Sequence, residues 1–221
     1  MTLTITDEGI VSYEEMLSKQ RSIFAEMVDK KKRGIPTEEE LILLTEHPPV
    51  ITLGKHANET NVLFNERELA RRGVKAYHIE RGGDVTYHGP GQLVAYPLLD
   101  LEAHRLGVKD YVNLLEEAVI LTIADFGIKG CRVAGASGVW IDAGTDRERK
   151  ICALGVKCSR YVTMHGLALN INTDLSGFNL INPCGFIDKG VTSMKAELGR
   201  SVDIQEVKYS LSKYFKELLH Y

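Results

Sequence analysis

The sequence predicts an α/β or α+β fold, a mixed β-sheet flanked by helices. Three segments have helical periodicity, and seven short runs rich in β-branched residues have the character of strands. Several of these runs follow one another with no helix between them, which favours a mixed or antiparallel sheet over strict alternation of strand and helix. No segment has the composition of a long linker, so we expect residues 1–221 to form a single domain.

Each predicted helix follows a side chain that can cap it. Ser12 with Glu15 has the spacing of a capping box, and this helix is expected to run to Lys32. The second helix follows Asp110, and the third follows Asp203. The apolar stripe of the second helix comprises Val112, Leu115, Val119, Ile123 and Phe126, and that of the third comprises Ile204, Val207, Leu211, Phe215 and Leu218.

The predicted strands lie between these helices. Their β-branched and apolar residues occur in runs of four to seven, which is the usual length of a strand. The runs are residues 40–45, 50–53, 75–79, 93–98, 138–141, 151–157 and 166–171.

Composition and charge exclude several classes of protein. With 27 basic and 30 acidic residues the net charge is −3, so a nucleic-acid binder that works by counterion release is not expected. No apolar run approaches the roughly 20 residues of a membrane span, and the first residues do not resemble a signal peptide. The 4 cysteines include no C-x-x-C pair, so we expect no metal site and no disulfide framework. We therefore predict a soluble, cytoplasmic protein with free thiols.

A glycine-rich stretch at residues 81–92, R-G-G-D-V-T-Y-H-G-P-G-Q, is the first candidate for a binding segment. Glycines let a ligand or another backbone approach closely, and the polar residues between them supply hydrogen bonds. The stretch matches neither a P-loop nor a dinucleotide-binding fingerprint. A pair of turns around a short strand is the structural alternative.

The second candidate region runs from Lys150 to Cys184. Pro183 and Gly185 flank Cys184, so this thiol is expected on a constrained turn where it can reach a cleft. Cys152 and Cys158 lie inside an apolar run, where a small buried side chain is the simpler interpretation.

Lys150 and two histidines are candidates for acid–base chemistry. A positively charged Lys150 close to a cysteine would favour the thiolate, whereas a neutral Lys150 would accept the proton of the thiol. The sequence leaves both roles open, and it also leaves open that Lys150 is a solvated surface residue. His88 and His165 each precede a glycine in the two candidate regions. Either ring would donate a hydrogen bond to a carbonyl oxygen, transfer a proton, or lie in the core with a backbone partner.

Four motifs occur in order: residues 81–92, K-I-C-A-L-G-V-K at 150–157, H-G-L-A-L-N at 165–170 and I-N-P-C-G at 181–185. Together, over roughly residues 40–198, they resemble the lipoyl(octanoyl) transferase family, and Thr192-Ser193-Met194 resembles a further element of that family. The resemblance implies the catalytic fold shared by biotin and lipoate protein ligases. It also implies transfer of an octanoyl group from acyl carrier protein to a lysine of lipoyl domains, the first step of lipoate assembly.

The resemblance places the acyl-thioester cysteine at Cys184 and its partner lysine at Lys150. The substrate-binding residues that it implies are Arg81, Gly82, Gly83, Asp84, Val85, Thr86, Tyr87, His88, Ala153, Leu154, Gly155, Gly166, Leu167 and Ala168, to which we add His165 beside Gly166. No metal or cofactor is implied, because a thioester is already activated. The implied partners are octanoyl-acyl carrier protein as donor, with lipoyl domains of 2-oxoacid dehydrogenase E2 subunits and the glycine cleavage H protein as acceptors.

This assignment fits the chemistry of the residues. A thiolate that first accepts and then releases the acyl group divides the transfer into two steps, and backbone N–H groups or His88 would stabilise the oxyanion. Burial of an eight-carbon tail is worth on the order of 5 kcal/mol, and Val85, Leu154 and Leu167 are candidates for the wall. Acidic carrier proteins would be attracted by basic clusters at residues 30–33, 71–72 and 147–149, although such clusters are more often solvated.

Three alternatives share the fold. An ATP-dependent lipoate or biotin ligase would activate a free acid and need no cysteine, so Cys184 argues against it, as does the missing G-R-G-R-x-G-R loop. An amidotransferase that takes its acyl group from another lipoyl-type protein would use the same thioester logic. A non-catalytic lipoyl-domain binding module would be indicated by loss of Cys184 or Lys150, and both are present.

Overall fold

The computed structural model describes residues 1–182 and 190–221; Cys184 therefore lies outside the described residues. The helices are α1 (Tyr13–Lys32), α2 (Glu66–Arg71), α3 (Val108–Ala124), α4 (Met194–Leu198) and α5 (Ile204–Leu219), with short 3₁₀ turns at Glu59–Asn61 and Leu175–Leu180. The strands are β1 (Thr2–Ile10), β2 (Glu39–Glu46), β3 (Val50–Leu53), β4 (Lys75–His78), β5 (Val85–His88), β6 (Gln92–Leu98), β7 (Cys131–Val133), β8 (Ala136–Ile141), β9 (Arg149–Ser159), β10 (Val162–Asn170) and β11 (Gly190–Val191).

These strands form two sheets. The larger has the order β1-β2-β6-β10-β9-β8-β7, with β11 paired to β9, and the smaller has the order β4-β3-β5. In the larger sheet β1 is parallel to β2 and β11 is parallel to β9, while the central strands β2, β6, β10, β9 and β8 pair antiparallel in that order. The sheet is therefore mixed, as the sequence predicted.

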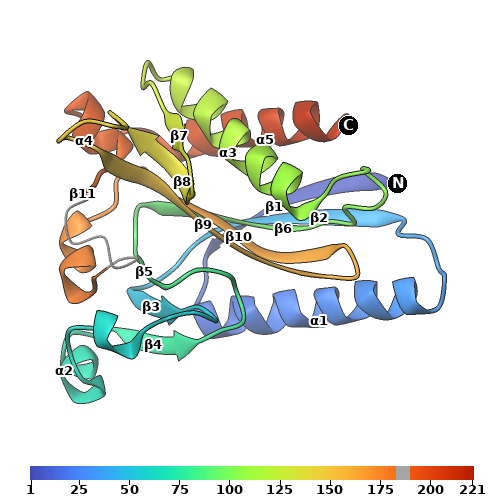
Figure 1. Cartoon of the computed structure of the whole chain (residues 1–221), viewed down its shortest axis with the longest axis horizontal. Helices are drawn as coiled ribbons and strands as arrows, with labels where there is room; N and C mark the ends of the chain where they lie inside the picture. The colour runs from blue at the N-terminus through green and yellow to red at the C-terminus, as the bar shows by residue number, and fades with distance from the viewer. Residues whose placement is uncertain (183–189) are drawn as a thin grey trace.

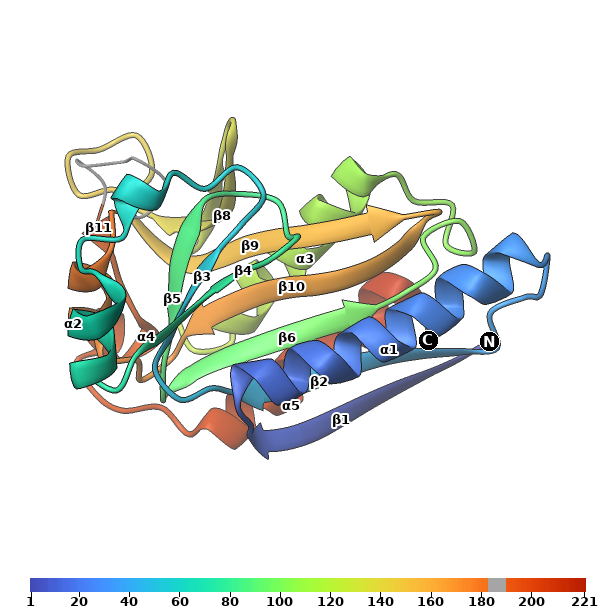
Figure 2. The same cartoon turned by 90° about the horizontal axis from the view of Figure 1, so that it is seen from below.

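Helices cover both faces of the larger sheet (Figure 1). α3 and α5 lie on one face, where Leu115, Val119 and Phe215 are fully buried against the strands. α1 crosses the other face and buries Met16 and Phe24 there. The small sheet lies beside α1 on this same side, as the view from below shows (Figure 2). The small sheet and α1 therefore share one face of the larger sheet, opposite α3 and α5.

The three predicted helices are all present, and each predicted strand run overlaps a strand. α3 begins at Val108, earlier than expected, because the Asp110 carboxylate accepts a hydrogen bond from the Gly107 backbone N–H at 3.3 Å and acts within the first turn. β5 forms inside the glycine-rich stretch, between its turns. β1, β7 and β11 and the short helices α2 and α4 were not predicted.

Gly166 allows β10 to lie against β6. A Cβ atom at Gly166 would stand 2.7 Å from Cδ of Pro97 and would also collide with the carbonyl oxygen of Ala95. We therefore expect Gly166→Ala to lower the free energy of unfolding by about 2 kcal/mol, measured by denaturant titration. Gly190→Ala is the matched control, since among the described residues its Cβ would meet Cβ of Arg149 at 3.4 Å, an ordinary contact. Equal stability of the two variants would contradict this expectation.

Candidate functional site

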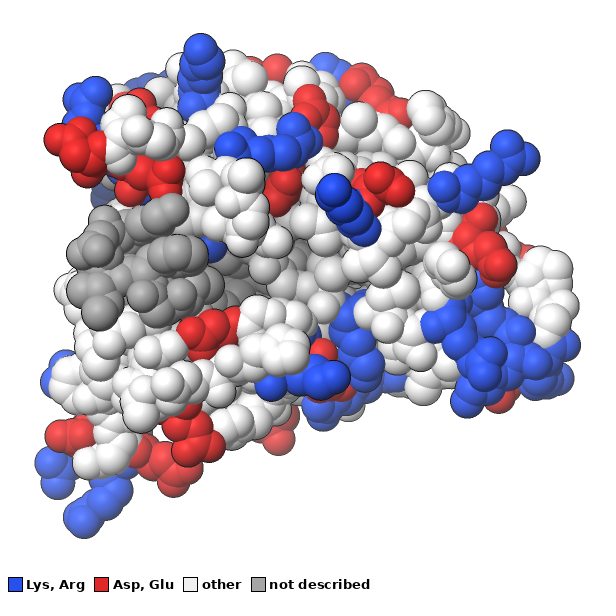
Figure 3. Space-filling view, viewed as in Figure 1, with Lys and Arg blue, Asp and Glu red and all other residues white. Residues whose placement is uncertain are grey.

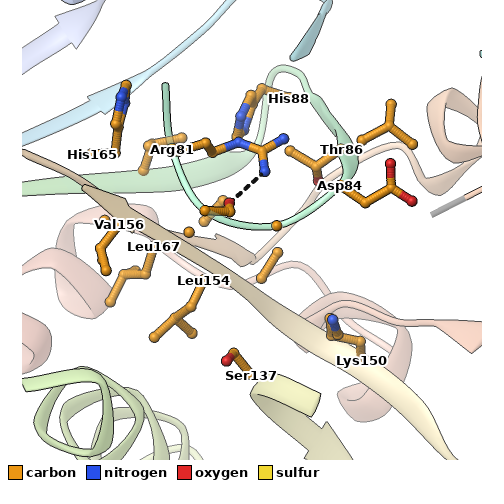
Figure 4. Close-up of a pocket in the computed structure, with 18 of the residues that line it drawn as sticks. Arg81, Asp84, Thr86, His88, Ser137, Lys150, Leu154, Val156, His165 and Leu167 are labelled. Carbon is orange, nitrogen blue, oxygen red and sulfur yellow. Dashed lines mark hydrogen bonds between the residues drawn. The ribbon is translucent and has the colours of Figure 1, made fainter. Parts of the chain in front are cut away.

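A cavity of about 500 Å³ opens between β9, β10 and the segment that leads into β5 (Figure 4). Lys150 and every predicted substrate-binding residue except Tyr87 line it. Further lining residues come from α1, β6 and β8, among them Tyr13, Val94, Tyr96 and Ser137. The fold thus brings together segments that lie far apart in the sequence.

Paired strands β9 and β10 form one long wall of the cavity. The register sets Ala153 opposite Ala168, and Leu154 opposite Leu167. Val156 lies six residue steps along β9 from Lys150, so this wall is about 20 Å long. Val85, Leu154 and Leu167, the residues that the sequence suggested for an apolar wall, all line the cavity. The wall suits an extended hydrocarbon that runs along the strands.

Lys150 lies at one end of this wall, where its side chain is held by β8. Its Nζ atom stands 4.5 Å from the centroid of the Trp140 ring, close enough for a cation–π interaction. A Cβ atom at Gly138 would lie 3.3 Å from Cε of Lys150 and 2.5 Å from the carbonyl oxygen of Cys152. Gly138, whose φ is +127°, therefore leaves room for the aliphatic part of the lysine side chain. The ammonium group is thus held beside the Trp140 ring instead of extending into solvent.

The chain is anchored to the cavity wall on both sides of residues 183–189. On the N-terminal side, the Asn182 backbone N–H donates to the Asn61 carbonyl oxygen at 2.7 Å, and the Asn61 amide donates to the Asp84 carboxylate at 2.6 Å. On the C-terminal side, Val191 pairs with Lys150 in register, and the Thr192 backbone N–H donates to the Lys150 carbonyl oxygen at 2.9 Å. Described residues before and after Cys184 are thus tied to walls that include Asp84 and Lys150.

Arg81 shapes the cavity through hydrogen bonds to the protein. Its buried guanidinium donates to the Thr52 carbonyl oxygen at 2.7 Å, to the Thr52 hydroxyl at 3.0 Å and to the Gly82 carbonyl oxygen at 3.0 Å. The glycine at position 155 makes this packing possible, because a Cβ there would stand 2.9 Å from Cδ of Arg81. Arg81 thus joins β3 to the loop that lines the cavity.

We expect Arg81→Lys to lower the free energy of unfolding by about 2 kcal/mol, because one ammonium cannot replace the fork of donors and leaves buried acceptors unpaired. Arg72→Lys is the control, since Arg72 is exposed and lies over the Phe64 ring at 4.5 Å. Denaturant titration of both variants measures the difference. An unchanged midpoint for Arg81→Lys would show that these hydrogen bonds add nothing to stability.

His88 belongs to a buried hydrogen-bond chain. Its Nδ1 lies 2.7 Å from Oε1 of Gln92, whose amide nitrogen donates to Oδ1 of Asn170 at 2.9 Å. Asn170 in turn donates to the Thr192 carbonyl oxygen at 2.9 Å.

Burial lowers the pKa of His88 to about 3, so the ring is neutral at pH 7. Because Gln92 presents its oxygen, Nδ1 carries the proton and Nε2 has only a lone pair. In this tautomer Nε2 of His88 accepts a hydrogen bond, and the hypothesis that His88 stabilises an oxyanion stays a prediction.

His165 lies at the end of the wall opposite Lys150 (Figure 4). It pairs with Val156, has a φ of +60° and is 2% exposed. Its backbone N–H donates to Oε1 of Gln20 at 3.0 Å. Burial lowers the pKa of the imidazole to about 3, so this ring is neutral too.

The family model described as the lipoyl protein ligase A/B catalytic domain matches residues 12–216. The chain belongs to this family. An octanoyltransferase of Bacteroides fragilis (strain YCH46) is 53% identical over 213 residues, 96% of each chain. An octanoyltransferase of Bacteroides thetaiotaomicron is 50% identical over 220 residues, which are 100% of this chain and 96% of the relative.

Solved structures of more distant proteins share the fold. A bi-partite lipoate protein ligase from Thermoplasma acidophilum superposes with a TM-score of 0.70 at 17% identity, covering 99% of this chain and 83% of that one. A lipoate-protein ligase A bound with ATP gives a TM-score of 0.69 at 16% identity, over 99% of this chain and 85% of the other. The predicted fold class is therefore confirmed.

Tyr87 is the predicted residue that the structure places elsewhere. Its ring packs edge-on against Phe178 with 5.5 Å between centroids, in the core of the small sheet. Cβ atoms at Gly89 or Gly177 would lie within 2.4 Å of this ring or its hydroxyl. Thr86 and His88 lie on the other face of β5 and line the cavity, whereas Tyr87 lies on the face of Val85 and, unlike Val85, does not reach the cavity. In this family member Tyr87 supports the wall instead of forming it.

Several cavity residues were missed by sequence reasoning. Gln92 and Asn170 are the last residues of the motifs at 81–92 and 165–170. Their amide side chains could have indicated a buried chain of hydrogen bonds. Tyr13 reaches the cavity from α1, and Ser137 reaches it from β8. Tyr13 and Ser137 lie outside the four motifs, and only the packing of α1 and β8 on the central strands brings them to the site.

The basic clusters that the sequence offered for docking differ in position. Positive side chains gather where α1 ends, far from β11 and the Lys150 end of the cavity (Figures 1 and 3). There Lys31 pairs with Asp100 and with Glu102 at 2.7 Å. Arg149 is nearer the cavity but forms ion pairs with Asp142 and Glu197.

None of the described helices is long and apolar enough to cross a bilayer.

Proposed function

We propose that this protein transfers an octanoyl group from acyl carrier protein to a lysine amine of a lipoyl domain, through a thioester on Cys184. The observation that carries the proposal is the cavity, whose apolar wall runs about 20 Å along β9 and β10 and ends at Lys150. Described residues flanking Cys184 are tied to this end, through Asn182 on one side and Val191 on the other. The family and its 53% identical octanoyltransferase relative support the same reaction.

The first step forms the acyl-enzyme. The Cys184 thiolate attacks the carbonyl carbon of the carrier thioester, a new carbon–sulfur bond forms, and the bond to the carrier sulfur breaks. The departing sulfur takes a proton from the Lys150 ammonium, which leaves Lys150 neutral for the second step. Both bonds are thioesters, so the step is close to isoenergetic and needs no external energy source.

The second step passes the acyl group to the acceptor. The neutral lysine amine of the lipoyl domain attacks the same carbonyl, an amide bond forms, and the Cys184 thiolate leaves. One proton is lost from the amine nitrogen. Lys150, once neutral, is the group we propose to accept it, since its head group lies at this end of the cavity.

The proposed setting follows from this chemistry. The donor is octanoyl-acyl carrier protein, and the acceptors are lipoyl domains of 2-oxoacid dehydrogenase E2 subunits and the glycine cleavage H protein, in the cytoplasm. A thioester donor is already activated, so no step of the scheme calls for a metal or a nucleotide.

Intact-protein mass spectrometry tests the proposal. The protein is mixed with octanoyl-acyl carrier protein, and we expect a gain of one octanoyl unit that maps to Cys184 and disappears when a lipoyl domain is added. A gain that requires octanoic acid and ATP would indicate a ligase instead. A gain only from an octanoylated H protein would indicate an amidotransferase. Transfer without any acyl-enzyme would contradict the thioester step.

A further inference from the structure

The main chain at Lys150 depends on a very short strand. β10 pairs with β9 as far as Cys152, and β11 continues the pairing beyond it, with Val191 opposite Lys150. β11 has two residues, whereas strands of globular proteins usually have roughly three to ten. Two residues make few main-chain hydrogen bonds, so the position of β11 on β9 depends on side chains as well.

The Glu197 carboxylate bridges these two strands. It accepts a hydrogen bond from the hydroxyl of Thr192, the residue that follows β11. It also accepts from Arg149, the β9 residue before Lys150, through Nε at 2.7 Å and through Nη2. Thr192 is 3% exposed, and the Glu197 side chain is 14% exposed. A two-donor contact between a guanidinium and a carboxylate has a defined geometry, so Glu197 holds β11 and β9 in one relative position.

Both partners of this ion pair are fixed by further contacts. Glu197 belongs to α4, which is anchored in the core by the fully buried Met194. The Arg149 guanidinium also donates to the Asp142 carboxylate at 2.6 Å. Hydrogen bonding to Arg149 holds the pKa of Glu197 below its ordinary value, so this carboxylate is ionised at pH 7.

Thr192 extends the restraint to Lys150. The Thr192 backbone N–H donates to the Lys150 carbonyl oxygen at 2.9 Å, and the Thr192 carbonyl oxygen accepts from Asn170 at 2.9 Å. On the opposite edge of β9, Trp140 pairs with Lys150, and its ring centroid lies 4.5 Å from Nζ. Lys150 therefore lies between β8 on one side and β11 on the other, and a shift of β11 would move its ammonium group.

We propose that Glu197 is a positioning residue for acyl transfer: by holding Thr192 to Arg149 it fixes the main chain at Lys150 and, through it, the place of the ammonium group in the cavity. This inference rests on the proposed octanoyl transfer, in which Lys150 favours the Cys184 thiolate and exchanges a proton. Glu197 does not line the cavity itself. Misplacement of a reacting group by about 1 Å costs on the order of a hundredfold in rate, so a contact outside the cavity is able to control the reaction.

A double-mutant cycle with Lys150 tests this role. Glu197→Gln keeps the size of the side chain, but it removes the charge and replaces one acceptor oxygen by a donor that faces Arg149. We expect kcat for octanoyl transfer to fall roughly tenfold, with KM for the loaded carrier protein unchanged. The pH profile of Cys184 alkylation should move toward that of Lys150→Met. In the Lys150→Met background, Glu197→Gln should not move the profile further, because the amine that it positions is already lost.

A second pair of variants leaves the ion pair with Arg149 in place. Thr192→Val replaces by a methyl group the hydroxyl that donates to Glu197, and Thr192→Ser retains that hydroxyl. We expect Thr192→Val to lower kcat roughly threefold and to move the alkylation profile in the same direction, and Thr192→Ser to retain the wild-type values. Glu117→Gln is the control for loss of a carboxylate, since Glu117 pairs with Arg132 at 2.6 Å and does not line the cavity.

The results separate a positioning role from a role in stability alone. If folded Glu197→Gln keeps the wild-type kcat and alkylation profile, Glu197 adds only stability and the positioning role is overturned. Thr192→Val decides in the same way if Glu197→Gln does not fold. A further shift of equal size in the Lys150→Met background would also overturn the role, because Glu197 would then act independently of Lys150. Without octanoyl transfer by the wild type the proposed function itself fails, whereas normal wild-type transfer with unchanged variants removes only the positioning role.

Discussion

Cys184→Ala is expected to reduce octanoyl transfer at least a thousandfold and to abolish the acyl-enzyme. The physical reason is the loss of the nucleophile, since the acceptor amine would then have to attack the carrier thioester directly, without a sulfur held beside the cavity. The measurements are single-turnover transfer from octanoyl-acyl carrier protein and the intact mass of the enzyme in the same mixture. Binding of the loaded carrier protein should persist, because the apolar wall is unaltered.

Cys158→Ser is the matched control for this variant. Cys158 is a half-buried thiol at the end of β9 remote from Lys150, opposite Thr163 in the register, and does not line the cavity. Loss of this thiol should leave both transfer and the acyl-enzyme intact. If Cys184→Ala still formed an acylated protein while Cys158→Ser did not, the covalent site would have been placed on the wrong cysteine.

Most of the fold could be predicted because its elements carry local signals. α1 has Ser12, whose side chain accepts from the Glu15 backbone N–H at 3.3 Å. In the predicted apolar stripe of α5, Val207, Leu211 and Phe215 are buried, and Ile204 and Leu218 are half-buried against the core. β1 was missed although residues 2–6 alternate polar and apolar side chains. It is an edge strand with few buried side chains, so its pairing to β2 depends on tertiary contacts more than on its own composition.

The motifs predicted which segments form the candidate site, but they did not predict how these segments are arranged in space. The sequence contained the segments at 81–88, 153–155 and 165–168, but only the antiparallel register of β9 and β10 places the last two side by side. The orientation of Tyr87 depends on which face β5 turns to the cavity, and a family resemblance does not fix that for one residue. The burial of Nε2 of His165 without a hydrogen-bond partner among residues 1–182 and 190–221 is likewise a property of packing, which no motif carries.

Lys150→Met is expected to slow acylation of Cys184 roughly a hundredfold. Methionine keeps an apolar stem as far as Cε, so packing beside Gly138 is largely retained, while the amine and its cation–π contact with the Trp140 ring are lost. Without an adjacent ammonium group the pKa of the cysteine returns toward that of an ordinary thiol, and less thiolate is present at pH 7. The rate of Cys184 alkylation measured across pH reports that pKa directly.

Lys150→Arg separates the two roles that a lysine can have at this place. Guanidinium keeps the positive charge but does not give up a proton near neutral pH, so it cannot act as a base. If Lys150 acts by charge alone, the arginine variant should restore thiol ionisation and transfer together. If it also removes a proton from the acceptor amine, alkylation should recover while transfer from the acyl-enzyme remains slow.

Lys157→Met controls for the loss of a lysine from the same strand. Lys157 also lies over an aromatic ring, 4.9 Å from the centroid of Phe24, and it pairs with Glu80 at 3.3 Å, but it does not line the cavity. Its replacement should leave the alkylation profile of Cys184 unchanged. An identical profile for the wild type and Lys150→Met would remove Lys150 from thiol activation, because a charge held close to the sulfur must alter the equilibrium between thiol and thiolate.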